Sequence, residues 1–152
     1  MKQNKHQILV TGGNGLLGKL VSSHLASSGY EILTHSRSGS TDLKSDLADY
    51  DDTFRLFKSV DPGLVVNLAA MTNVDECELN KDAAFRANTL AVQNVVDATK
   101  AHGLKPFFIH FSTDQLYDNP SPSIEENAVI QNYYSMTKYA GELALQSVPS
   151  MI

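Results

Sequence analysis

Short apolar runs alternate with amphipathic stretches along the chain. Runs with the continuous apolar character of buried β-strands cover residues 7–11, 31–36, 64–69 and 106–112. Apolar residues that recur every three or four positions predict helices over residues 16–28, 51–60, 81–101 and 133–146. Continuous apolar strands are buried on both faces, and helices between them imply parallel crossover connections. The pattern therefore predicts an α/β fold with a doubly wound parallel sheet.

Composition and charge exclude several classes of protein. The 152 residues are 42% hydrophobic and 19% charged, as in one ordinary folded domain. The formal net charge of −5 gives no basic surface, so we expect neither nucleic acid nor an anionic membrane as partner. Without a bilayer-length apolar run or a signal peptide's apolar core, a cytoplasmic location is expected. One cysteine and five scattered histidines predict no metal site.

The segment TGGNGLLG, residues 11–18, joins the first predicted strand to the first predicted helix. In such a unit the glycines allow a sharp turn at Gly12, close approach of a pyrophosphate at Gly15 and close helix–strand packing at Gly18. The freed backbone amides and the helix N-terminus then bind phosphate. A plain turn would need one glycine at most. We therefore predict a Rossmann-like dinucleotide site, which also includes Asn14, Leu16 and Leu17.

The end of the second predicted strand bears on the choice between NAD and NADP. An acidic residue there would bind the ribose of NAD, but the sequence is THSRSGS, with Arg37 between Ser36 and Ser38. An arginine fork suits a phosphate dianion, so this loop favours NADP(H) over NAD(H) through its 2′-phosphate. The alternative is an arginine that lies in solvent.

Four segments in a set order resemble one enzyme family. They are TGGNGLLG, NLAAMTNVDECE, FSTDQLYD and NYYSMTKYAGE, the last with a Tyr-xxx-Lys pair. Together they resemble the extended short-chain dehydrogenase/reductase superfamily, of the NAD-dependent epimerase/dehydratase type, and within it the dTDP-4-dehydrorhamnose reductases. The resemblance spans residues 8–145. It implies an NAD(P)-dependent oxidoreductase that reduces a nucleotide-sugar substrate in dTDP-rhamnose biosynthesis.

The resemblance implies roles for residues near the predicted carboxyl edge of the sheet. Tyr134 would donate a proton to the ketone oxygen as hydride arrives, because the Lys138 ammonium one helical turn later favours loss of the phenolic proton. Both would also contact the cofactor, Lys138 through the nicotinamide ribose. Thr113 would hold the carbonyl oxygen, unless its hydroxyl caps backbone groups. Asn88 would steady the active-site backbone, unless it is a polar residue satisfied among the helices.

Five further positions match the family's cofactor site by the same resemblance. Asp46 and Leu47 would pack on adenine. Ala69 and Ala70 would leave room for the ribose, and Thr72 would contact nicotinamide or substrate.

Two departures from the family pattern bear on function. Gln115 stands where a sugar-nucleotide dehydratase has glutamate, so reduction is favoured over dehydration. Family members are about twice as long, so residues 1–152 would be the NAD(P)-binding domain, with the C-terminal substrate domain absent and the sheet truncated near the start of its sixth strand. Such a chain would need a homo-oligomer or its missing half, and its activity alone stays open. The alternatives are a non-catalytic NADP-binding subunit and a sugar-nucleotide epimerase.

Overall fold

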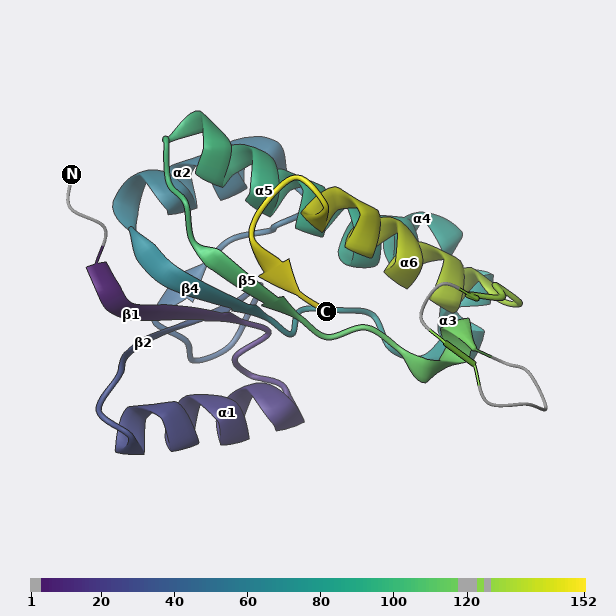
Figure 1. Ribbon diagram of the computed structural model, residues 1–152, viewed down its shortest axis with the longest axis horizontal. Helices are drawn as coiled ribbons and strands as arrows, with labels where there is room; N and C mark the ends of the chain where they lie inside the picture. Colours follow the sequence, from purple (N-terminus) through teal and green to yellow (C-terminus); the bar gives the residue numbers. More distant parts are fainter. Residues whose placement is uncertain (1–3, 118–122, 125–126) are drawn as a thin grey trace.

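A six-stranded parallel sheet forms the centre of the computed structural model, which describes residues 4–117, 123–124 and 127–152 (Figure 1). The strand order is β3-β2-β1-β4-β5-β6, and every neighbouring pair is parallel. The strands are β1 (Asn4–Thr11), β2 (Glu31–Ser36), β3 (Leu43–Lys44), β4 (Pro62–Asn67), β5 (Phe107–His110) and β6 (Ser150–Met151). The order reverses between β1 and β4, and this doubly wound topology confirms the predicted Rossmann-like fold.

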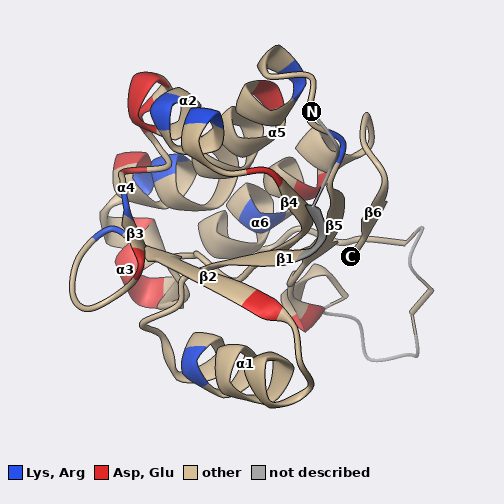
Figure 2. Cartoon of the chain, turned by 90° about the vertical axis from the view of Figure 1, so that its left-hand side faces the viewer, with Lys and Arg blue, Asp and Glu red and all other residues tan. Residues whose placement is uncertain are grey.

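Helices cover the two faces of the sheet unequally. One face carries α2 (Tyr50–Ser59), α5 (Ala91–Ala101) and α6 (Tyr133–Leu145), whereas α1 (Leu16–Ser27) lies on the other (Figure 1). The main core lies under the three-helix layer, where Phe57, Val96 and Phe108 are almost fully buried. Charged residues gather on the helices, above all on α2, α3 (Val74–Leu79) and α4 (Lys81–Phe85), while the strands are largely uncharged (Figure 2).

The apolar face predicted for α1 is buried only in part. Val21 and Leu25 pack against a small second core under the sheet. By contrast, Leu16 and Leu20 are 85% and 63% exposed, because no described element covers the first turns of this helix. Among the described residues, every helix falls short of the length and apolar character that a bilayer crossing requires.

The structure adds three short elements to the predicted ones, β3, α3 and the 3₁₀ helix η2 (Asp114–Leu116), and changes a fourth. β3 has two residues and α3 has six, too few for a periodic pattern to be recognised. The helix predicted over residues 81–101 is a continuous run of α4, a π-helical segment η1 (Arg86–Leu90) and α5. A π turn holds one residue more than an α turn, and such turns are frequent at functional sites. Here the extra residue reorients the side chains of η1 relative to those of α5.

Candidate functional site

A cavity of about 780 Å³ opens where β1, β2 and β4 end. This is the carboxyl edge of the sheet, at the point where the strand order reverses, which is the usual ligand site of such folds. Residues predicted to bind the cofactor that do line the cavity are Gly12, Asn14, Gly15, Arg37, Asp46, Leu47, Ala69 and Ala70. Predicted site residues that are not among its lining are Leu16, Leu17, Gly18, Thr72, Asn88, Thr113, Tyr134 and Lys138.

The glycine loop comes closer to neighbouring backbone than any side chain would allow. Gly12 has a φ of +68°, and a Cβ there would lie 2.8 Å from the amide nitrogen of Ala69. A Cβ on Gly18 would lie 2.2 Å from the Gly12 carbonyl oxygen. Gly15 precedes α1 and offers its first turn no side-chain cap. The first amides of α1 are therefore available to an anion, as the phosphate role of this loop requires.

The loop after β2 is held by a short hydrogen-bond network. The side-chain amide of Asn14 donates to the Ser36 hydroxyl, at 3.0 Å, and to the Ser38 carbonyl. These bonds tie the glycine loop to the segment that contains Arg37, which lines the cavity between them. His35 also lines the cavity, and its Nε2 lies 2.9 Å from the Ser45 hydroxyl. Burial lowers the pKa of His35 below its ordinary value, so the ring is neutral at neutral pH.

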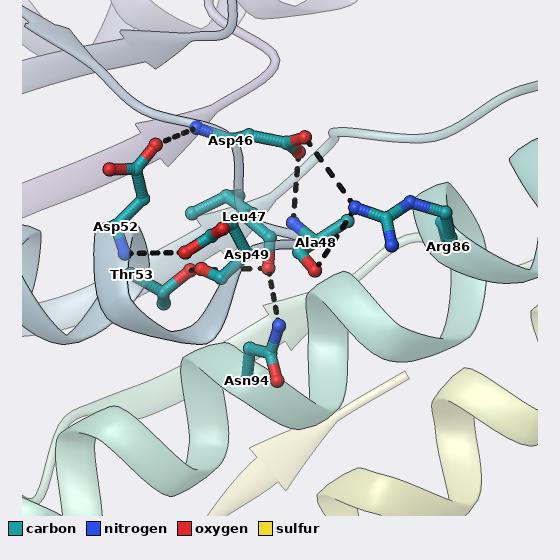
Figure 3. Close-up of polar contacts among 8 residues, drawn as sticks. All are labelled: Asp46, Leu47, Ala48, Asp49, Asp52, Thr53, Arg86 and Asn94. Carbon is teal, nitrogen blue, oxygen red and sulfur yellow. Dashed lines mark hydrogen bonds and ion pairs between the residues drawn. The ribbon is translucent and has the colours of Figure 1, made fainter.

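The turn predicted to pack on adenine is fixed from two sides (Figure 3). Asp46 accepts a bond from the Ala48 amide at 3.0 Å and forms an ion pair with Arg86, Nη2 to Oδ2, at 3.8 Å. The Leu47 carbonyl accepts a bond of 2.9 Å from the Asn94 side chain on α5. Arg86 lines the cavity and was not predicted, because its contact with Asp46 joins segments that lie far apart in the sequence.

A buried polar row joins the carboxyl ends of β1, β4 and β5. The Thr11 hydroxyl donates to the Asn67 side chain at 2.5 Å, and Asn67 Nδ2 lies 2.9 Å from Nδ1 of His110. Thr11 also accepts bonds of 3.2 Å from the amides of Leu68 and Ala69. The row therefore sets the path of the loop that forms one wall of the cavity.

Asn88 connects the loop after β4 with α6. Its side chain is 1% exposed, accepts from the Met71 amide at 2.8 Å and donates to the Met71 carbonyl at 3.0 Å. It also donates to the Thr137 hydroxyl at 3.1 Å. The residue is thus satisfied inside the molecule, and its partners are the backbone beside Ala70 and Thr72. Its predicted role in steadying the site stays a prediction with suitable geometry.

The start of α6 is fixed by a capping box and by a hydrogen bond to Gln115. Asn132 caps the helix in a capping box with Ser135. Gln115 accepts a bond of 2.9 Å from the Asn132 side chain. Gln115 therefore helps to place the helix that begins immediately before Tyr134, in addition to replacing the dehydratase glutamate. Tyr134 is 8% exposed, in a small apolar cluster with Cys77.

Lys138 belongs to α6, and its side chain is almost fully buried beside the end of β5. Its side chain is 3% exposed, and Nζ donates to the Phe111 carbonyl at 2.5 Å. Burial lowers the pKa of Lys138 to about 8, an effect that the nearby Glu142 carboxylate partly opposes. Burial, with a smaller contribution from the Lys138 charge, lowers the pKa of His110 to about 3. His110 is therefore neutral, and the charge of Lys138 is sensitive to its surroundings.

The hydroxyls of Ser112 and Thr113 have different partners. Ser112 donates to the Glu142 carboxylate. Thr113 accepts a bond of 3.2 Å from the Gln115 amide and so caps η2 (Asp114–Leu116), which is the alternative role for this hydroxyl. Its contact with a substrate carbonyl stays a prediction.

Comparison with known proteins places the chain in a family. Residues 6–151 match the family model described as the RmlD substrate binding domain. The chain belongs to this family. The match confirms the resemblance found in the motifs, because the curated relatives include dTDP-4-dehydrorhamnose reductases, such as that of Burkholderia thailandensis. That relative is 36% identical, over 91% of this chain and 45% of its own length.

Another curated relative and a solved structure are similar over most of this chain. The probable low-salt glycan biosynthesis reductase Agl14 of Haloferax volcanii is 34% identical, over 91% of this chain and 48% of its own length. The structure of a Bacillus anthracis dTDP-4-dehydrorhamnose reductase in complex with NADP is 26% identical, with a TM-score of 0.80 over 98% of this chain and 52% of that one. The chain spans about half the length of the curated relatives it matches.

Proposed function

We propose that residues 1–152 form the NAD(P)-binding domain of an NADP(H)-dependent reductase that acts on a keto-sugar nucleotide of the dTDP-4-dehydrorhamnose type. The observation that supports this most strongly is the cavity at the carboxyl edge, whose glycine loop leaves no space for a Cβ at Gly12 or Gly18. The names of its RmlD-family relatives and the NADP bound to the Bacillus anthracis structure support the same proposal.

The residues of the chain fit a nicotinamide dinucleotide along this edge. The glycine loop and the open N-terminus of α1 would bind the pyrophosphate, and Arg37 the 2′-phosphate. The Asp46–Leu47 turn would lie at adenine, and the loop from Ala69 to Thr72 beside the ribose and nicotinamide. When bound, the reduced nicotinamide supplies the hydride for a ketone carbon.

The chemistry proposed for the chain itself is proton transfer to the ketone oxygen. Tyr134 would donate the proton, Lys138 would stabilise the phenolate that remains, and Thr113 would hold the oxygen. In support, Lys138 is bonded at the end of β5, and Thr113 follows that strand by three residues. Gln115 in place of a glutamate favours reduction over dehydration.

A fluorescence titration tests the cofactor part of the proposal. The purified chain is expected to change the emission of NADPH in a saturable way, because a preformed glycine-loop site orders the nucleotide. Boiled protein is the control for unspecific effects. A chain that leaves the emission of both NADPH and NADH unchanged would contradict the proposal.

The choice of NADP(H) over NAD(H) is tested at Arg37. Arg37→Ala is expected to weaken the binding of NADPH by about 2 kcal/mol, roughly a thirtyfold increase in Kd. The reason is that the substitution removes a charge-assisted hydrogen bond to the phosphate. The affinity for NADH, which has a hydroxyl instead of the phosphate, should hardly change. Lys19→Ala, on the exposed side of α1, is the control for a lost surface charge. Equal losses for the two dinucleotides would rule out the phosphate role.

One relative favours a second function, a non-catalytic binding subunit. The methionine adenosyltransferase 2 subunit beta of Danio rerio is 31% identical, over 90% of this chain and 42% of its own length. An assay with dTDP-4-dehydrorhamnose separates the two functions. Oxidation of NADPH in the presence of this sugar nucleotide supports the reductase, whereas tight binding without oxidation supports the subunit. The epimerase alternative instead requires NAD that remains bound through purification.

A further inference from the structure

Two hydrogen bonds join the end of β5 to α6, one helical turn apart. The Phe111 carbonyl accepts from Lys138, and the next residue, Ser112, donates to Glu142. Thr113 follows directly. Since Tyr134, Lys138 and Glu142 are spaced four residues apart, they lie along one side of α6. The pair of bonds therefore fixes the strand end against the side of the helix on which Tyr134 lies.

Burial of Lys138 as an ammonium group costs free energy unless its charge is balanced. An almost fully buried ammonium loses its hydration, and a carbonyl partner alone restores only part of the lost free energy. From β5, the titratable group that faces Lys138 is His110, which is neutral. From η1, the side chains that reach α6, Asn88 and Thr89, are uncharged. On α6 itself, Glu142 stands one helical turn after Lys138, and its negative charge raises the pKa of Lys138.

The Glu142 carboxylate is not free to turn to solvent. It is half-buried, and the hydroxyl of Ser112 holds it on the side of α6 that faces β5. Ser112 is thereby occupied, whereas the hydroxyl of the neighbouring Thr113 donates to the Asp114 carboxylate at 3.5 Å. Ser112 thus keeps the negative charge of Glu142 one helical turn from Lys138.

We infer that Ser112 and Glu142 act as a positioning pair: Ser112 holds the Glu142 carboxylate one helical turn from Lys138, where its negative charge favours the charged form of the buried ammonium. The inference rests on the proposed function for its role in catalysis, because that function needs a charged Lys138 beside the phenol. The arrangement itself is a property of the folded chain and can be measured without any cofactor.

The test is a measurement of the Lys138 pKa. It uses NMR on protein that is labelled with ¹³C at the lysine side chains. The Lys138 signal is assigned by its loss in Lys138→Arg. In Glu142→Gln the pKa is expected to fall by roughly one unit, because the substitution removes an opposite charge and leaves burial unopposed. Glu78→Gln is the matched control, since Glu78 also bonds to α6, at the Tyr133 amide, but is not a source of the charge that acts on Lys138. It should leave the pKa unchanged.

The outcomes separate a positioning role from a structural one. A lower melting temperature of Glu142→Gln with an unchanged Lys138 pKa would overturn the inference. If that variant does not fold, Ser112→Ala releases the carboxylate and should lower the Lys138 pKa in the same direction by a smaller amount. No change in a folded Ser112→Ala would also overturn it. NADPH binding is measured separately, so its absence would contradict the proposed function without affecting this result.

Discussion

Tyr134→Phe is expected to slow the NADPH-dependent reduction of dTDP-4-dehydrorhamnose by about three orders of magnitude, the usual contribution of a positioned general acid. The substitution removes the hydroxyl that would protonate the ketone oxygen. The ring itself stays, so its packing in the cluster with Cys77 and Ala84 is retained. The affinity for NADPH should therefore stay within about twofold, a change that corresponds to only a fraction of a kcal/mol.

The measurement is the rate at which NADPH absorbance falls, together with the Kd from fluorescence. Tyr133→Phe is a matched control on the preceding residue, because its ring lies under Lys81, 5.3 Å from Nζ to the ring centroid, and no catalytic role is proposed for it. It should retain most of the activity. A Tyr134→Phe protein that turns over at the wild-type rate would remove this tyrosine from the mechanism.

Gly18→Ala is expected to destabilise the fold by about 3 kcal/mol and to abolish dinucleotide binding. The new Cβ would lie 2.2 Å from the Gly12 carbonyl oxygen and 2.9 Å from the Gly13 Cα. Both are backbone atoms, so relief of the clash must move either the glycine loop or the start of α1. In both cases the amides that would bind the pyrophosphate change place.

Urea unfolding and the NADPH titration report the two effects. Ser23→Ala, an exposed position on α1, is the control for an added alanine on the same helix and should shift the free energy of unfolding by no more than about 0.5 kcal/mol. Wild-type stability and NADPH affinity in Gly18→Ala would show that the loop tolerates a side chain, against the geometry found here.

The sequence predicted the parts of this molecule whose pattern repeats over several residues. Buried strands appear as apolar runs, and the glycine loop appears as a spacing, since each depends on residues close together in the chain. The cavity accordingly contains Gly12 and Gly15 from the loop and Arg37 from the end of β2. The family resemblance added the Asp46–Leu47 turn, which also lines the cavity.

The remainder depends on contacts between distant segments and left no local pattern. Arg86 pairs with Asp46, forty residues earlier in the sequence, and no local pattern shows such a contact. His35 was not predicted to line the cavity, because an uncharged residue in a buried strand shows no pattern that would mark it as ligand-binding. For Gln115, the missing carboxylate gave no sign of the hydrogen bond from the Asn132 side chain, which joins η2 to the start of α6. Leucines that looked like a buried face of α1 are exposed because burial also requires a covering element.

The π turn at η1 sets a limit on how this part of the gene can vary in length. Deletion of a single codon within residues 86–90 would let the helix become regular, a change that costs little in most helices. Because a π turn holds one residue more than an α turn, the helix on either side would keep its orientation, but the side chains within the turn would change place. Asn88 would then no longer reach both the Met71 backbone and Thr137. Insertions and deletions in this family should therefore accumulate in surface loops and be rejected in this one turn.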